Sequence, residues 1–316
     1  YLFSNSLSNY LNQQNKGEIR QRPLFLSYSK DLIQEAKKKV KGILQCNGKM
    51  FMEATNFDDA TTRLFDSSFG SYSNFLLDLL PTEKKDGFPP EKYIDFTEFS
   101  NLWRKEISTE TLKKLSPELI WHVIRTYIKG MRQGENDYLD IDSFNEYPLK
   151  RRTVETGTFR KIFNEIWRPW YKDKLCDKGG CWDDQDLTRE LLDNNDYELD
   201  RFSAIFCDEA QDFTKNEIEL ILKLSKFSKK SIPPHLLSHI PFVFAGDPFQ
   251  TLNPTGFSWE LVKADFHDHF LNPLLANQKY IEGKNRVSLD FNFKELNFNY
   301  RSAKNIVSFA NLIQLL

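Results

Sequence analysis

The chain has 316 residues, of which 40% are hydrophobic and 28% charged, and its formal net charge is −2. This composition is ordinary for a soluble globular protein that is long enough for two domains, and it excludes a strong overall positive charge that would attract nucleic acid. No run of eighteen apolar residues and no signal pattern at the amino end occur, so we expect no membrane partner and a cytoplasmic location, or a nuclear one in a eukaryote.

The first 45 residues alternate between helical and strand patterns. Residues 1–15 have a helical spacing of apolar side chains, and Pro23–Leu26 is a short apolar run that predicts a buried strand. Ser29 is expected to cap the next helix, whose apolar face carries Leu32, Ile33, Ala36, Val40, Ile43 and Leu44. Helix, strand and helix in succession are typical of a parallel sheet.

Residues 51–195 have a different character, because runs typical of buried strands are missing there. Two helical faces are expected, with loops near 87–90 and 135–146. These faces consist of Ile120, Ile124, Tyr127 and Ile128, and of Phe159, Ile162, Phe163 and Ile166. We therefore expect a mainly helical insertion.

After residue 200 the strand and helix patterns return. Residues 202–207 predict a buried strand, Thr214 to Glu217 form a capping-box pattern for a helix, and residues 240–245 predict a further strand. A short strand is expected near residues 296–298, and Ser302 is expected to cap a last helix. The predicted fold class is therefore α/β, with a parallel sheet and a mainly helical insertion.

Three polar clusters each follow a predicted strand. They are Asp208-Glu209-Ala210-Gln211, Gly246-Asp247-Pro248-Phe249-Gln250 and Asn299-Tyr300-Arg301-Ser302. Taken singly, each has an ordinary explanation as a loop, a turn or a helix cap. Two adjacent acids at the carboxyl end of a buried strand, however, are what nucleotide hydrolysis needs, one to hold magnesium and one to orient and deprotonate water.

In order, spacing and strand context, these clusters resemble the motifs of the UvrD/Rep/PcrA family of superfamily 1 helicases. The resemblance covers residues 1–45 and 200–316, and the Asp208–Gln211 cluster is similar to the family's Walker B motif. It implies a RecA-like P-loop NTPase sheet, with residues 1–50 and 196–288 in the first motor domain. Residues 51–195 would be the helical accessory insertion and 289–316 the start of the second motor domain.

The resemblance also implies an ATP-dependent DNA helicase or translocase that uses ATP and Mg²⁺ and moves 3′ to 5′ on single-stranded or partly duplex DNA. Asp208 would hold magnesium and Glu209 would be the base. Gln250 would sense the γ-phosphate and Arg301 would meet the charge that develops on it. Tyr300 would stack on adenine, and Asp247 belongs to the same nucleotide site.

Nucleic-acid contacts are expected at the segment after the first strand, where Tyr28 and Ser29 are candidates for sugar and phosphate contact. Ser29 has the alternative of serving only as a helix cap. Phe257 and Trp259 are candidates for stacking on bases, and the alternative for both is packing inside the domain.

One expected motif is missing from these residues. A Walker A loop needs Gly, four residues, then Gly-Lys-Ser or Gly-Lys-Thr, and neither Gly48-Lys49 nor Gly283-Lys284 fits. We expect a piece of a larger motor whose phosphate-binding loop precedes it. A catalytically inactive helicase-like module for nucleic-acid binding or scaffolding, and an RNA-directed ATPase of the same fold, are the alternatives.

The four cysteines suggest no special chemistry. Cys207 lies within a predicted strand and is expected to be a small buried hydrophobic residue. Cys176 and Cys181 are separated by four residues and have no second pair of ligands nearby, which argues against zinc. Reduced thiols are the simplest interpretation.

Overall fold

The computed structural model describes residues 2–14, 21–46, 58–107, 114–131, 138–149, 152–194, 202–225, 242–247 and 259–267. All of these lie in one compact unit, Tyr1–Tyr280. The strand and the helix expected after residue 289 lie outside the described residues.

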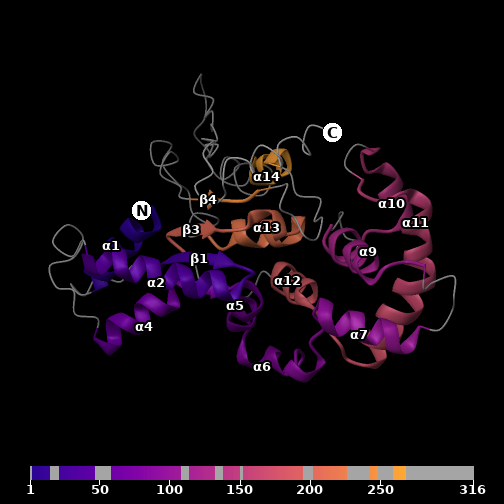
Figure 1. The fold of residues 1–316 in the computed structure, drawn as a ribbon, viewed down its shortest axis with the longest axis horizontal. Helices are drawn as coiled ribbons and strands as arrows, with labels where there is room; N and C mark the ends of the chain where they lie inside the picture. The colour runs from indigo at the N-terminus through magenta and orange to yellow at the C-terminus, as the bar shows by residue number, and fades with distance from the viewer. Residues whose placement is uncertain are drawn as a thin grey trace, which may run out of the picture. The chain divides into compact units, whose positions relative to one another are not determined.

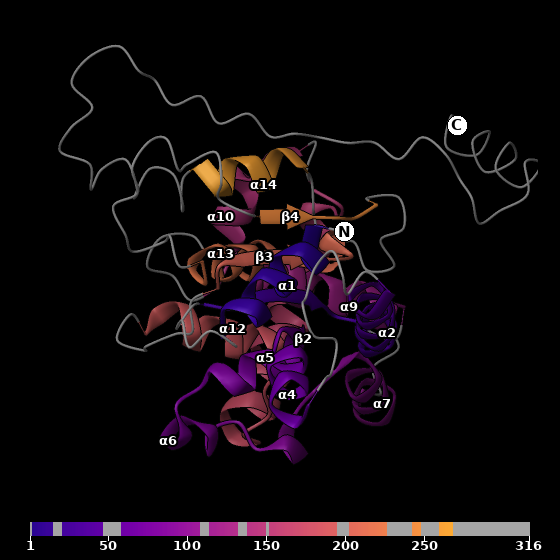
Figure 2. The same cartoon turned by 90° about the vertical axis from the view of Figure 1, so that its left-hand side faces the viewer.

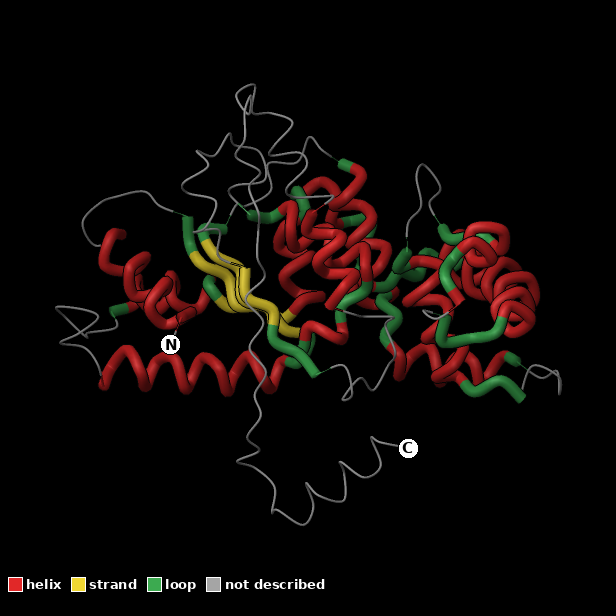
Figure 3. The backbone as a smooth tube through the Cα atoms, turned by 90° about the horizontal axis from the view of Figure 1, so that it is seen from above, coloured by secondary structure: helices red, strands yellow, loops and turns green. Residues whose placement is uncertain are grey.

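The described strands form one parallel sheet in the order β2-β1-β3-β4. Figure 3 shows these strands, in yellow, gathered in one place with helices on either side. Their bounds are β1 (Pro23–Ser27), β2 (Phe69–Ser71), β3 (Ala204–Cys207) and β4 (Phe242–Phe244). Phe25 of β1 lies opposite both Phe69 and Phe206, and Phe206 lies opposite Val243. Because all pairs are parallel, the four carboxyl ends lie at the same edge of the sheet, which we call the carboxyl edge.

Three of these strands were predicted from the sequence, and β2 was not. The predicted strands are confirmed as β1, β3 and β4, and Cys207 is buried as expected. The strand β2 contradicts the expectation of no strand between 51 and 195. Its three residues, Phe-Gly-Ser, are too few and too weakly apolar to give a strand pattern, so its position depends on pairing with β1.

One face of the sheet is covered by α1 (Leu2–Gln14), α2 (Lys30–Cys46) and α4 (Asp59–Ser67) (Figure 1). Phe3 of α1 lies in edge-to-face contact with Phe25, Phe69 and Phe206, at ring-centroid distances of 5.5, 5.1 and 5.2 Å. One helix side chain therefore touches three adjacent strands. The expected helix over 1–15 and its buried face are confirmed, and Ser29 caps α2 by accepting a hydrogen bond from the Leu32 amide at 3.2 Å.

Residues 72–194, which we call the helical region, lie between β2 and β3. Its helices are α5 (Tyr72–Leu79), α6 (Thr82–Lys85), η1 (Pro90–Lys92), α7 (Phe96–Glu106), α9 (Pro117–His122), the π-helix η2 (Val123–Lys129), α10 (Ile141–Glu146), α11 (Thr156–Lys161), the π-helix η4 (Ile162–Lys178) and α12 (Asp184–Asp193). The two predicted apolar faces are buried together in a core separate from that of the sheet. In Figure 1, α12 lies between the sheet and helices α7 and α9.

One detail of this region departs from the sequence-based expectations. The loop expected over 135–146 contains α10, which Asp140 caps by accepting from the Ser143 amide at 2.8 Å. The sequence did not indicate this short capped helix because the stretch is mostly polar. Its Phe144 stacks on Phe159, with the two ring centroids 3.9 Å apart. The mainly helical character of the region is as expected.

After β3 the chain forms the 3₁₀ turn η5 (Ala210–Asp212) and α13 (Lys215–Lys223), and after β4 it forms α14 (Trp259–Asp265). The predicted capping box is confirmed, because Thr214 and Glu217 each bond the backbone of the other. Figure 2 shows α14 beside β4, and the rings of Phe266 and Phe242 lie 5.7 Å apart. None of the described helices has the length and apolar content that crossing a bilayer requires.

The contacts of Phe3 lead to a first prediction. Replacing Phe3, which is only 6% exposed, by alanine removes a ring that packs on three strands. We expect the free energy of unfolding to fall by about 3–5 kcal/mol, measured by denaturant titration. Leu2→Ala is the control, because Leu2 is 69% exposed and its loss should change stability by less than about 0.5 kcal/mol. Similar values for the two variants would contradict the packing described here.

Candidate functional site at the carboxyl edge of the sheet

Backbone hydrogen bonds join the loops that follow β1, β3 and β4. The amide of Asp208 donates to the carbonyl oxygen of Leu26 at 3.0 Å, and the amide of Ala245 donates to the carbonyl oxygen of Cys207 at 2.8 Å. The amide of Ala210 then donates back to the carbonyl of Ala245 at 2.8 Å. The carboxyl ends of three strands are therefore bonded to one another, and the side chains of the loops that follow these strands lie at fixed distances from one another.

Glu209 has a strained backbone at this edge. Its φ of 54° and ψ of 47° are in the left-handed region, and it is the sole non-glycine residue with positive φ among the described residues. This conformation costs a side-chain-bearing residue roughly 1–2 kcal/mol, and residues held in strained conformations cluster at functional sites. It turns the chain sharply from β3 into η5, so that Asp208 and Glu209 both remain at the carboxyl edge.

Gln211 connects Glu209 to the loop after β4. Its side-chain Nε2 donates to Glu209 Oε2 at 2.6 Å, and its Oε1 accepts from the amide of Asp247 at 3.1 Å. The side chain of Gln211 is buried, which gives both bonds a fixed geometry. The sequence motif included Gln211 without a role, and the structure provides one, as the link between two loops.

Asp208 has the properties of a cation ligand. Its carboxylate is half-buried, and burial together with the charge of Glu209 raises the pKa of Asp208 above its usual value. A bound cation would offset both effects. The described residues contain no group of three or more acidic, histidine or cysteine side chains that could hold a metal alone. Magnesium needs only one or two protein carboxylates when phosphate oxygens supply other ligands, so Asp208 fits this ion.

The two candidates after β1 make contacts within the protein. The Tyr28 hydroxyl donates to Glu217 and accepts from Arg125 Nη2 at 2.7 Å, while its ring packs on Tyr72 and Phe213. The hydroxyl of Ser29 accepts the α2 amide described above. Both residues are at the carboxyl edge and half-buried, and their contact with nucleic acid stays a prediction.

The structure thus brings together Asp208, Glu209 and Asp247, with Tyr28 and Ser29 at the same edge. Trp259 is half-buried at the start of α14, a helix that packs against α13, and its stacking on bases also stays a prediction. The remaining candidates lie outside the described residues; these are Gln250, Phe257, Tyr300 and Arg301.

Sequence analysis missed the charged residues behind this edge. Arg125 and Lys129 were overlooked because they lie in a helix recognised only by its apolar positions. Lys129, with its side chain 2% exposed, contacts Asp183 and Asp186 at 2.5 and 2.6 Å. A signal was present in the sequence, since Asp183, Asp184 and Asp186 form an acidic cluster. Arg189, which pairs with Asp186 at 3.5 Å, is the nearest cation along the chain, and it leaves an excess of acids.

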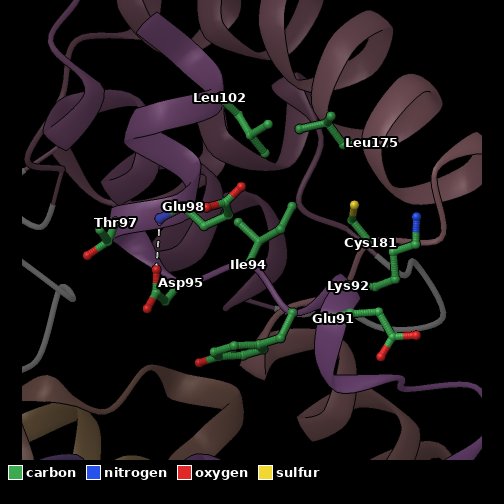
Figure 4. A pocket seen from close by; sticks show the side chains of 10 residues that line it. Glu91, Lys92, Ile94, Asp95, Thr97, Glu98, Leu102, Leu175 and Cys181 are labelled. Atoms are coloured by element: carbon green, nitrogen blue, oxygen red, sulfur yellow. Dashed lines mark hydrogen bonds between the residues drawn. The ribbon is translucent and has the colours of Figure 1, made fainter. Parts of the chain in front are cut away.

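A cavity of about 540 Å³ lies elsewhere, between the start of α7 and the end of η4 (Figure 4). Its lining combines aliphatic and acidic side chains, among them Ile94, Leu102, Leu175, Glu91, Asp95 and Glu98. The half-buried thiol of Cys181 also lines it, and burial raises the pKa of this thiol. None of the predicted site residues that the structure describes lines this cavity.

Neither the models of protein families nor the curated proteins contain a match to this chain.

Gly246 allows a direct test of the link made by Gln211. A Cβ at residue 246 would lie 2.5 Å from Gln211 Oε1 and 3.0 Å from the Ala210 nitrogen. Gly246→Ala should therefore displace Gln211 and lower the free energy of unfolding by about 1–3 kcal/mol. Gly42→Ala in α2, where no atom lies within 4 Å, should instead stabilise by about 1 kcal/mol. Denaturant titration measures both, and equal shifts would exclude a close contact at Gly246.

Asp184, the first residue of α12, leads to a prediction about pH. The hydroxyl of Tyr93 donates to its two oxygens at 3.2 Å each. Burial and the nearby charge of Glu217 raise the pKa of Asp184 to about 7, although Arg125 and Ser73 oppose this. Between pH 4 and pH 7 the folded protein therefore retains a proton that the unfolded chain has lost. In this window Asp184 makes the protein less stable as the pH rises.

Asp184→Asn removes this titration, so its melting temperature relative to the wild type should increase steadily from pH 4 to pH 7 and then level off. Thermal unfolding followed at several pH values measures the difference. Asp193→Asn, at the exposed other end of α12, is the control and should show no such increase. A constant offset for Asp184→Asn across this window would contradict the raised pKa.

Proposed function

We propose that this chain is part of an ATP-dependent motor that moves along single-stranded DNA, of the superfamily 1 helicase type. The observation that carries the proposal is the arrangement of Glu209, which Gln211 holds beside Asp208 and against the loop after β4. Open parallel sheets bind their ligands outside the carboxyl ends of their strands, and this arrangement is at that edge. Within the α/β class, we propose that the fold is RecA-like.

In this proposal Glu209 is the base that orients and deprotonates the water attacking the γ-phosphate. Its strained backbone is consistent with a side chain that must point in one direction. Asp208 would hold magnesium, and the ion supplies positive charge to the phosphate oxygens when bound. We assign Asp247 and Tyr300 to nucleotide binding, Gln250 to sensing the γ-phosphate and Arg301 to the charge that develops during transfer.

A second candidate function is a catalytically inactive helicase-like module that binds nucleic acid or serves as a scaffold. The sequence observation in its favour is that these 316 residues contain no Walker A pattern. The two proposals differ in the behaviour of the full-length protein. The motor hydrolyses ATP faster when single-stranded DNA is added, whereas the module binds DNA without hydrolysis. Stimulation by RNA in place of DNA would indicate an RNA-directed ATPase.

Glu209→Gln in the full-length protein tests the proposed base. The amide keeps the size of the side chain and can still accept from Gln211, so the fold and ATP binding should be retained. Turnover with saturating single-stranded DNA should fall by about 10²–10⁴-fold, the usual contribution of a positioned base. Steady-state hydrolysis and nucleotide titration measure the two quantities.

Glu83→Gln, at an exposed position of α6, is the matched control and should change neither quantity. Near-normal turnover by Glu209→Gln would remove Glu209 from the role of base. A loss of ATP binding as large as the loss of turnover would show that Glu209 binds the nucleotide rather than activates water.

A further inference from the structure

Arg125 is a buried cation that belongs to the helical region but points at the carboxyl edge. It lies on η2, and its side chain is only 14% exposed. Its neighbours along this helix are largely apolar and buried, among them Ile124, Tyr127 and Ile128. A charge in such a place is stable only when partners compensate for the water that it has lost.

The partners of Arg125 come from three separate segments. Its Nη2 atom lies 2.7 Å from the hydroxyl of Tyr28, 3.1 Å from the carbonyl oxygen of Asp212, and 3.2 Å from each carboxylate oxygen of Glu217. Tyr28 follows β1, Asp212 ends the turn that begins at the paired acids after β3, and Glu217 is in the first turn of α13. One guanidinium group therefore joins the helical region to both loops of the candidate site.

Glu217 extends this junction. Its carboxylate has no exposed surface, and it accepts from the amide of Thr214 at 2.6 Å and from the side chain of Gln185 on α12. The charge of Glu217 fixes the start of α13 immediately after the Asp208–Asp212 turn. Removing Arg125 alone would leave this carboxylate without its cation.

Further hydrogen bonds make the connection stiff. The backbone amide of Asn216 donates to the carbonyl of Gly130 at 3.1 Å, and its side chain donates to the carbonyl of Lys129 at 2.8 Å. The last residues of η2 are thus bonded to the first turn of α13. A displacement of η2 has to move the loops after β1 and β3 together, because well-packed elements transmit small shifts rather than absorb them.

We propose that Arg125 is a positioning residue that couples nucleic-acid binding to the orientation of the Asp208–Asp212 turn, so that hydrolysis depends on a bound single strand. The inference rests on the proposed function. In this scheme Arg125 contacts neither the nucleotide nor the water that attacks the γ-phosphate. When the loop at Tyr28 or the helical region moves, Arg125 moves the turn that carries Glu209 with it.

The test compares Arg125→Lys with Arg152→Lys in the full-length protein. Lysine keeps the positive charge, but its ammonium nitrogen is one bond nearer to the backbone than Nη2, the atom through which Arg125 contacts the oxygens of three segments. Arg152 is a matched control, because its guanidinium bonds the carbonyls of Tyr147 and Asn145 and the hydroxyl of Thr156, all within the helical region. Hydrolysis is measured with and without oligo(dT).

For Arg125→Lys we expect the ratio of stimulated to unstimulated turnover to fall at least about tenfold, with the KM for ATP within about twofold of the wild type. Arg152→Lys should keep the ratio. Because Arg125→Lys can fold poorly, the double variant Arg125→Met with Glu217→Gln is made as well. It removes both charges at once and leaves neither buried without a partner. It should lose stimulation to the same extent.

A preserved ratio in a folded Arg125 variant overturns the inference, and so does an equal fall in both rates, which would indicate a structural ion pair only. Hydrogen exchange separates this failure from that of the proposed function. Arg125→Lys, unlike Arg152→Lys, should speed exchange in residues 27–30 and 208–217 together. If the wild type hydrolyses no ATP, the proposed function fails and the control of hydrolysis fails with it, whereas exchange still reports whether Arg125 joins the two loops.

Discussion

A carboxylate that is completely removed from water has to be surrounded by hydrogen-bond donors. Glu217, whose side chain has no exposed surface, is such a carboxylate. Its donors come from Tyr28, Arg125, Gln185 and Thr214, which belong to four different parts of the chain. Each of these parts can take only the position that keeps its donor within reach. The loop after β1, η2, α12 and the start of α13 are therefore held in fixed relative positions by one buried charge.

This fixed surrounding explains how the turn at Glu209 tolerates its strained backbone. A left-handed residue with a side chain persists only where neighbouring structure holds it. Here Ala210 is bonded to Ala245, and Gln211 is bonded on one side to Glu209 and on the other to Asp247. The cost of the strained residue is met by contacts on either side of it, and the result is a pair of carboxylates with a defined direction.

Sequence patterns predicted those parts of the fold that depend on local features. Apolar runs predicted β1, β3 and β4, and the spacing of Phe3 and its neighbours predicted α1, because burial of one face leaves a periodic trace. The short strand β2 and the helix α10 left no such trace. The paired acids of the candidate site were visible at the end of a strand. Arg125 was not, because its importance depends on partners distant in sequence, such as Tyr28 and Glu217.

The topology gives a physical reason for the link between the helical region and the carboxyl edge. In a parallel sheet the chain leaves each strand at this edge, so an insertion after β2 must begin there. Its first residue, Tyr72, already packs its ring on Tyr28 and Phe213, at 5.0 and 5.2 Å. A large helical region that starts at the carboxyl edge packs against the loops of the candidate site. Buried hydrogen bonds there specify one arrangement of the helical region against the sheet. Apolar packing alone would allow several.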